Sequence, residues 1–224
     1  MGEQIRQEVC YPNLNVKIAC SHGGVTPAND GASHQSIEDM GVYRTIPNMT
    51  VMMPADYYAA KALVKEAANT YGPMYLRFTR DAVPVIYDEN TKFEIGKAKR
   101  LTEGRDVAMI AIGDTVHLAL EAQKELEKAG ISARVLDMHT LKPLDEKAVL
   151  DCVRDIGRII TVEDHNILNG LGSAVCEIAA EAGDAKVKRV GIQDQFGMSA
   201  PYERLLEING ITVEHLVALA KQEW

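Results

Sequence analysis

The sequence lacks both a long apolar run and an excess of positive charge. No apolar segment approaches the roughly 18 residues that a membrane-spanning helix needs, so we expect no membrane partner. The amino terminus has no apolar signal-peptide core, so we expect a cytoplasmic protein. The formal net charge is -8, whereas nucleic-acid binding depends on a basic surface. We therefore expect no nucleic-acid partner.

Cysteine is scarce, and its spacing does not match a zinc motif. The four cysteines are Cys10, Cys20, Cys152 and Cys176, and no pair has the spacing of a zinc knuckle. The apolar neighbours of Cys152 and Cys176 are typical of small core residues. Free thiols fit a reducing cytoplasm. We expect neither a structural disulfide nor a metal site.

Apolar segments are present, but they are short and regularly spaced. Hydrophobic residues make up 46% and charged residues 25% of the chain, the balance of an ordinary globular protein. The apolar segments alternate with amphipathic helical patterns, which is typical of a parallel α/β sheet covered on both faces. The predicted strands cover residues 15–20, 50–53, 74–78, 106–112, 133–138, 158–162 and 188–192.

Polar residues are predicted to begin several of the helices. Asp114, Asp145 and Thr212 each precede apolar residues at helical spacing. Their side chains can accept a hydrogen bond from the backbone of the first helical turn. Gly130 follows the helix that Asp114 would cap and is suited to ending it.

A domain boundary is predicted near residues 83–92. Pro84 and the polar segment 88–92 interrupt the alternating pattern there, as a linker does. Residues 93–224 make a complete series of strands and helices with a core of its own. Residues 1–90 hold too few strands for an independent doubly wound domain, so we expect them to be the tail of a domain whose beginning is absent.

The segment at residues 21–35 is rich in glycine and contains His22, Asp30 and His34. It follows a predicted buried strand and should lie at that strand's carboxyl edge, where open α/β sheets bind ligands. Its glycines allow positive φ angles and a close approach of the backbone to a ligand. Imidazoles can bind phosphate or hydroxyl oxygens, or move protons near neutral pH. The alternative is an ordinary loop, with Ser36 and Asp39 capping the next helix.

Arg80 ends the apolar segment at residues 75–80. Arginine at the carboxyl end of a strand suits bidentate recognition of a phosphate or carboxylate. The alternative is a surface arginine paired with Asp81. From the residues alone, the surface pair is the favoured interpretation.

A third polar group, Glu163-Asp164-His165, precedes a helix that begins near Gly170 and Gly172. The two glycines suggest a nucleotide-binding turn, but the three-glycine fingerprint is incomplete and the acidic residues would repel a phosphate. Asp164 could orient the ring of His165. A satisfied polar cluster at a domain interface is the favoured interpretation.

Taken together, these segments resemble the transketolase family over nearly the whole chain. The order and spacing of the segments carry the resemblance, and no single motif decides it. The nearest likeness is to the smaller subunit of split transketolases, in which two chains encode the enzyme. Residues 11–18, 21–24, 30–39, 46–51, 54–56 and 73–80 resemble the pyrimidine-binding domain, and residues 136–145, 162–165 and 170–174 the carboxyl-terminal domain.

The resemblance implies an α/β fold in two parts. Residues 1–90 would be a partial doubly wound pyrimidine-binding domain, with its amino-terminal part missing. Residues 93–224 would be a complete α/β transketolase C-terminal domain with a mostly parallel sheet.

The resemblance also implies roles for individual residues. His34 aligns with a catalytic histidine near the reacting carbons, which hydrogen-bonds or relays protons. Asp30 aligns with an acid that reads the hydroxyl configuration of the donor sugar. His22 and Arg80 align with residues that hold the distal phosphate or hydroxyls of the substrate. The family usually has Gly-Glu where this chain has Ala-Asn at residues 28–29, so one charge is lost beside Asp30.

Thiamine diphosphate and Mg²⁺ are the implied cofactors of the complete enzyme. The family's activating glutamate and the aromatic residues around the cofactor ring lie upstream of the position that Met1 matches, and the larger subunit holds the diphosphate and metal. The cofactor-binding residues of this chain are therefore unknown. We expect a truncated fragment that is inactive alone, that needs the larger cofactor-binding subunit, and that self-associates through an exposed sheet edge.

The implied activity is transfer of a two-carbon ketol unit between sugar phosphates, as in the pentose phosphate pathway. A 1-deoxyxylulose-5-phosphate synthase and the β subunit of a 2-oxo-acid dehydrogenase share these domains and are alternatives. A non-catalytic dimerisation or docking module is an alternative of another class.

Overall fold

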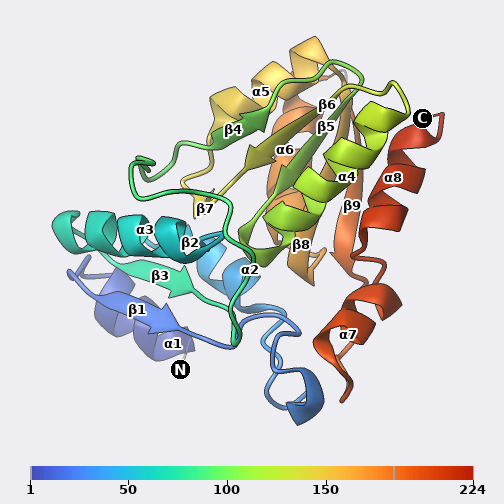
Figure 1. Ribbon diagram of the computed structural model, residues 1–224. Coiled ribbons are helices and arrows are strands. Elements are labelled where there is room, and N and C mark those ends of the chain that lie inside the picture. The colour runs from blue at the N-terminus through green and yellow to red at the C-terminus, as the bar shows by residue number, and fades with distance from the viewer. Residues whose placement is uncertain (1, 184, 224) are drawn as a thin grey trace.

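Two sheets form the framework of the chain in this computed structural model, which describes residues 2–183 and 185–223. The first sheet contains β1 (Lys17–Cys20), β2 (Thr50–Met52), β3 (Met74–Arg77) and β7 (Thr140–Lys142). Its strand order is β1-β3-β2-β7 (Figure 1), with β1 and β2 parallel to β3 and with β7 antiparallel to β2.

The second sheet is larger and has the strand order β4-β6-β5-β8-β9. Its β5, β6, β8 and β9 run parallel, and β4 joins one edge antiparallel to β6. The mixed α/β architecture with mostly parallel sheets confirms the predicted fold class. The strands are β4 (Lys99–Thr102), β5 (Val107–Ala111), β6 (Ala133–Asp137), β8 (Arg158–Asn166) and β9 (Lys186–Ile192).

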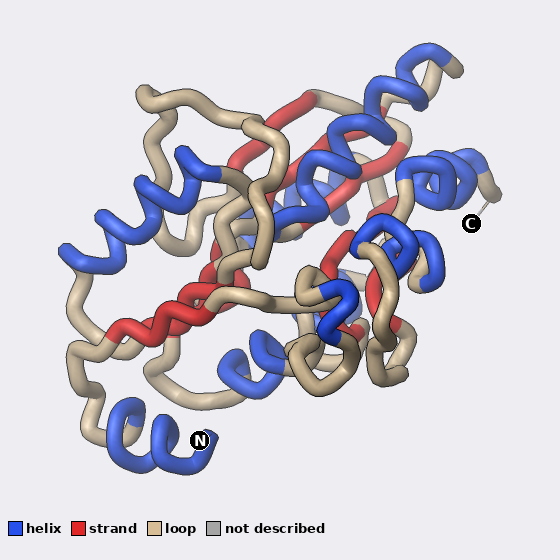
Figure 2. The backbone as a smooth tube through the Cα atoms, turned by 60° about the horizontal axis from the view of Figure 1, so that its bottom comes forward, coloured by secondary structure: helices blue, strands red, loops and turns tan. Residues whose placement is uncertain are grey.

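Helices cover the faces of both sheets. Helix α3 (Tyr57–Asn69) packs on the first sheet, whereas α4 (Val116–Lys128) and α8 (Val213–Lys221) pack on one face of the second and α5 (Glu146–Asp155) and α6 (Leu171–Ala182) on the other. Figure 2 shows the amino-terminal turns beside the first sheet. The shorter helical segments are α1 (Gly2–Gln4), η1 (Ile5–Cys10), η2 (Ala28–Asp30), α2 (Asp39–Arg44), η3 (Gly113–Thr115) and α7 (Tyr202–Ile208).

Strand β5 lies at the centre of the core and is fully buried, as its continuous apolar run predicts. Side chains alternate between the two faces of a strand. Ala108 and Ile110 accordingly pack with α5 and α6, and Val107 and Met109 pack with α4 and α8. Tyr75 of the first sheet shares the cluster that contains Ile110. The two sheets therefore meet across one continuous apolar core.

Two of the three predicted helix caps are confirmed. The Asp145 carboxylate accepts a hydrogen bond from Ala148 N, and the Thr212 hydroxyl accepts one from His215 N. The Asp114 prediction is wrong. Its buried carboxylate instead accepts a hydrogen bond from the Tyr202 hydroxyl at 2.5 Å, because α7 packs close to the start of α4.

Strands β4 and β7 had no apolar sequence signal. Strand β4 is rich in charge, and β7 is three residues long, so neither gives a distinct apolar run. Strand β7 follows β6 in the chain but pairs with β2, which completes the first sheet with residues from the later part of the sequence. In the part of the chain that the structure describes, no helix is both long enough and apolar enough to cross a membrane.

Candidate active site

The loop at residues 21–35 leaves β1 at its carboxyl end, as predicted. The predicted burial of this strand is wrong, because β1 is a partly exposed strand at one end of the sheet. Parallel pairing puts the ends of β1 and β3 side by side, with Cys20 opposite Arg77. Gly23 N then donates a hydrogen bond to Phe78 O at 3.0 Å, which ties the two strand ends together. The loops that follow β1 and β3 consequently emerge at one edge of the sheet, where parallel sheets bind ligands.

The structure leaves all four predicted site residues exposed, in the loops that follow β1 and β3. His22 and His34 are exposed, and the Nδ1 atom of each ring contacts the hydroxyl of the preceding serine at 2.8 Å and 3.0 Å. Asp30 and Arg80 come together in an ion pair of 2.6 Å, with 40% and 38% of their side chains exposed. Both members of this pair can therefore reach a ligand in solvent.

Arg80 is anchored by the loop that it faces. Its Nη1 atom donates to Pro27 O at 2.9 Å as well as to the Asp30 carboxylate. The predicted alternative of a pair with Asp81 is wrong, because Asp30 is the acidic partner of Arg80 in the described residues. Only folding reveals this pair, since 50 positions separate the two residues.

The buried residue Arg77 supports the loop from the protein interior. This arginine was not identified from the sequence as part of the site. Its side chain is fully buried at the end of β3, and its Nε atom lies 3.1 Å from the Asp39 carboxylate. The Nη2 atom donates to Ser36 O at 2.9 Å and to Asp164 O at 3.0 Å. Burial alone would lower the pKa of Arg77, but the carboxylates of Asp39 and Asp164 raise it above the usual value. The guanidinium thus links the loop, α2 and β8 through one charge.

The adjacent glycines Gly23 and Gly24 pack against these buried side chains. A Cβ atom on Gly23 would lie 2.2 Å from Arg77 Nε, and one on Gly24 would lie 2.0 Å from Asp164 Oδ2. Gly24 also has a φ of 66°, which L side chains rarely adopt. The close backbone approach that the glycines predict is therefore made to protein groups.

Asp39 begins α2 but does not cap it, so the predicted cap is wrong. Its carboxylate pairs with Arg77 and accepts a hydrogen bond from the Tyr75 hydroxyl at 2.6 Å. Burial beside this carboxylate raises the pKa of Tyr75. The hydroxyl therefore stays protonated and keeps donating to Asp39.

The favoured interpretation of Asp164 and His165 as a buried polar cluster is supported, but Asp164 does not orient the ring. The Asp164 carboxylate accepts from Val25 N at 2.9 Å. The ring of His165 accepts from Gly41 N at Nε2 and donates from Nδ1 to Asn166 O, an assignment fixed by these partners. Burial lowers the pKa of His165 to about 4. This imidazole is therefore neutral and structural at neutral pH.

Glu163 occupies the place where a nucleotide phosphate would bind at α6. Its carboxylate accepts from Leu171 N and Gly172 N, both at 2.7 Å. Burial raises the pKa of Glu163 to about 7, although these two N–H donors oppose the shift. The helix amino terminus is thus satisfied by the protein itself.

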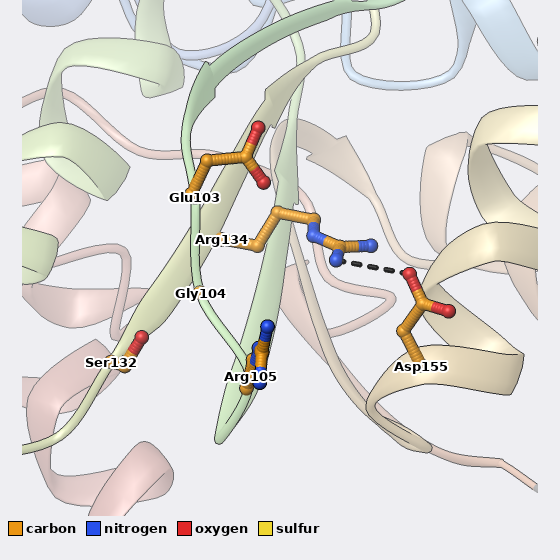
Figure 3. A pocket seen from close by; sticks show the side chains of 6 residues that line it. All are labelled: Glu103, Gly104, Arg105, Ser132, Arg134 and Asp155. Carbon is orange, nitrogen blue, oxygen red and sulfur yellow. Dashed lines mark hydrogen bonds and ion pairs between the residues drawn. The ribbon is translucent and has the colours of Figure 1, made fainter.

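A polar cleft of about 650 Å³ lies at the amino ends of the parallel strands of the second sheet (Figure 3). It sits where β5 and β6 begin, between Arg105, Ser132 and Arg134. Arg134 points toward Asp155 and donates to its carboxylate at 3.0 Å. Glu103 lines the same cleft, so two arginines face two acids and the charges balance. The amino edge of a parallel sheet is also not where such sheets bind ligands.

Comparison with known proteins agrees with this geometry. Residues 1–85 match the transketolase pyrimidine-binding domain and residues 96–216 match the transketolase C-terminal domain. The chain is 43% identical to the putative transketolase C-terminal section of Methanocaldococcus jannaschii, over 99% of this chain and 70% of that protein. The chain belongs to the transketolase family. This confirms the resemblance inferred from the sequence.

Relatives within the transketolase family differ in their named substrates. The chain is 39% identical to a 6-deoxy-6-sulfo-D-fructose transketolase subunit of Clostridium sp. (strain MSTE9), over 98% of this chain and 68% of that protein. A solved structure described as a split gene transketolase, inactive beta4 tetramer, has a TM-score of 0.91 and 45% identity. That likeness covers 98% of this chain and 70% of the other.

Family membership and the pyrimidine-binding domain point to dependence on thiamine diphosphate. Within residues 2–183 and 185–223, no group of three or more His, Cys, Asp or Glu side chains could hold a metal ion. The buried carboxylates of Asp39, Asp164 and Glu163 are already engaged by Arg77 or by backbone N–H groups. The roles proposed below therefore concern the sugar substrate alone.

Proposed function

We propose that this chain supplies the sugar-phosphate-binding part of a transketolase that transfers a two-carbon ketol unit between sugar phosphates. The supporting observation is that His22, Asp30, His34 and Arg80 are all exposed in the loops that leave β1 and β3, with Asp30 and Arg80 in contact. This group combines cationic and imidazole donors with a carboxylate acceptor. A phosphorylated polyol needs both kinds of partner.

Each of the four side chains has a distinct proposed role. Arg80 and His22 donate hydrogen bonds to the distal phosphate oxygens of the sugar. Asp30 accepts from a sugar hydroxyl. The Nδ1 atom of His34 faces Ser33 Oγ, so its Nε2 atom hydrogen-bonds the reacting part of the sugar and moves a proton there. A bound phosphate competes with Asp30 for Arg80, which frees the Asp30 carboxylate for a hydroxyl.

The thiamine diphosphate and Mg²⁺ of the complete enzyme are assigned to a larger partner chain. We also propose self-association, because β1 lies at one end of the strand order of the first sheet and an edge strand offers unpaired backbone groups. Sedimentation of the isolated chain over a wide concentration range tests this. A monomer at every concentration would contradict it.

An assay of the assembled enzyme tests the proposed activity. The chain is mixed with the cofactor-binding subunit, thiamine diphosphate and Mg²⁺, and ribose 5-phosphate is supplied as acceptor. We expect ketol transfer from xylulose 5-phosphate and none from pyruvate. Because one relative is named for a sulfosugar, 6-deoxy-6-sulfofructose is a third donor. Stable association without transfer from any ketose would favour a non-catalytic module.

A further inference from the structure

The substrate loop is held by a segment from the far end of the chain. This bracing segment, residues 197–199, lies in the connection between β9 and α7. Ser199 Oγ donates to Asn29 O at 2.7 Å, and Gln35 Nε2 donates to Met198 O at 3.0 Å. Figure 1 shows the coil of η2 below α7. The contacts therefore join residues that are more than 160 positions apart in the sequence.

Gln35 lies at the centre of this contact. Its side-chain amide is buried and donates to Ala28 O at 3.1 Å as well as to Met198 O. Because both partners are carbonyl oxygens, the NH₂ group must face them and the amide cannot be reversed. One side chain thus fastens the start of η2 to the bracing segment, directly beside His34.

The packing around Gln35 leaves no room for a side chain at Gly197 of the bracing segment. A Cβ atom on Gly197 would lie 1.6 Å from Gln35 Oε1. Gly31 meets the same segment from the other side, where its Cβ atom would lie 3.6 Å from Ser199 Cβ. The segment and the loop are thus in direct contact.

Besides the bracing segment, the contacts of Arg80 with Pro27 and Asp30 and a series of local turns hold the tip of the loop. Asp30 N donates to Pro27 O, Gly31 N to Ala28 O and His34 N to Gly31 O, each within the loop itself. Such turns set local shape but do not fix the loop against a scaffold. The bonds from Gln35 and Ser199 attach residues 28, 29 and 35, which flank Asp30 and His34.

We propose that Gln35 and Ser199 are positioning residues, through which the carboxyl-terminal part of the chain sets the placement of Asp30 and His34 for substrate. The inference rests on the proposed function and adds a specific task for the bracing segment. A shift of about 1 Å in a substrate-positioning group can lower the reaction rate by roughly 100-fold. Looser attachment of Asp30 should raise the KM for the donor sugar, and looser attachment of His34 should lower kcat.

Hydrogen–deuterium exchange of the whole chain without substrate tests the brace independently of activity. Gln35→Glu keeps the side-chain shape but removes the two donors and faces a carboxylate toward carbonyl oxygens. We expect the amides of residues 30, 31 and 34 to exchange at least roughly 5-fold faster, the effect of losing about one hydrogen bond. Exchange of residues 107–111 in the core should be unchanged. Gln193→Glu is the matched control, because Gln193 is exposed on the same connection.

Ser199 provides a milder test that does not depend on how well Gln35→Glu folds. Ser199→Ala removes one exposed hydroxyl, and Ser199→Thr keeps it. We expect faster exchange in Ser199→Ala and recovery in Ser199→Thr. Unchanged exchange in both Gln35→Glu and Ser199→Ala would overturn the brace, whether or not the assembled enzyme transfers ketol units.

Kinetics of the assembled enzyme test the link to substrate. We expect kcat/KM to fall roughly 10-fold in Gln35→Glu, less in Ser199→Ala, and not at all in Gln193→Glu. Faster loop exchange with unchanged kcat and KM would overturn the positioning role while leaving the proposed activity intact. Absence of transfer in the unsubstituted assembly would instead contradict the proposed function.

Discussion

At the scale of single residues, Arg77 at the end of β3 and Arg80 in the loop that follows have different surroundings. The buried guanidinium of Arg77 contacts the Asp39 carboxylate and the carbonyl oxygens of Ser36 and Asp164. The half-exposed guanidinium of Arg80 pairs with Asp30, which is also partly exposed to solvent. A buried ion pair contributes little net stability, but removing one partner leaves an uncompensated charge in the interior. The two residues should therefore respond to substitution through different properties, stability for Arg77 and substrate affinity for Arg80.

Arg77→Met tests the buried charge. The substitution leaves the Asp39 carboxylate buried without its cation, so we expect the free energy of unfolding to fall by about 3–5 kcal/mol. Urea denaturation followed by circular dichroism measures the change. Arg204→Met is the matched control, because Arg204 pairs with Glu207 on the surface and such pairs are worth less than about 1 kcal/mol. Equal losses in the two variants would contradict the structural role of Arg77.

Arg80→Ala tests the proposed phosphate contact. A charge-assisted hydrogen bond contributes about 1.5–3 kcal/mol, so we expect KM for a phosphorylated ketose donor to rise roughly 10- to 100-fold in the assembled enzyme. A donor without phosphate should show little change. Arg100→Ala, which removes an exposed arginine from β4, is the control. An equal rise in KM for both donors would show that Arg80 does not recognise the phosphate.

The sequence indicated Arg80 but not Arg77, and the reason is physical. A strand end predicts where a side chain emerges, and this prediction needs only local information. The burial of Arg77 depends on Asp39 and on Asp164, which lies 87 positions away. The arginine within an apolar strand was an available signal that was not used, whereas the glycines of the loop were interpreted as allowing close approach to a ligand.

At the scale of elements, local signals predicted most strands and the capping of α5 and α8. The continuous apolar runs predicted the bounds of β5 and β6 almost to the residue, because a strand buried on both faces is apolar along its whole length. Strand β7 could not be predicted in the same way, since its pairing with β2 joins segments about 90 positions apart. Asp114 failed as a cap because the competing donor, Tyr202, comes from α7.

Asp145→Ala tests a cap that sequence and structure agree on. The carboxylate of Asp145 accepts from Ala148 N in the first turn of α5 and from Ala98 N just before β4. We expect the free energy of unfolding to fall by about 1–2 kcal/mol, near the upper range for a lost cap. Asp151→Ala, which removes a partly buried acid that pairs with Lys147 and Arg154 around the same helix, is the control. A smaller loss at Asp145 than at Asp151 would contradict the capping role.

At the scale of the whole molecule, buried titratable groups couple folding to pH in opposite directions. Burial lowers the pKa of His139 and of His165 to about 4, so each is neutral in the folded chain and protonates in the unfolded chain below about 6.5. Burial raises the pKa of Asp137 and of Glu163 to about 7, so each holds a proton that the unfolded chain releases. The histidines therefore destabilise the fold as pH falls from about 6.5 to 4, and the acids destabilise it as pH rises from about 4 to 7.

Because the two trends oppose each other, removing one histidine should shift the pH dependence of stability toward that of the buried acids. In His139→Gln, the unfolded state no longer gains that proton on acidification. The slope of unfolding free energy against pH should therefore become more negative by about 1 kcal/mol per pH unit between pH 5 and 6, since one proton corresponds to about 1.4 kcal/mol per unit. Urea denaturation at intervals of half a pH unit measures the slope, which is independent of any constant loss of stability caused by the substitution.

His215→Gln makes the same change on an exposed ring of α8 and should keep the parental slope. If His139→Gln also kept that slope, the buried imidazole of His139 would have to gain its proton in the folded chain as readily as in the unfolded one.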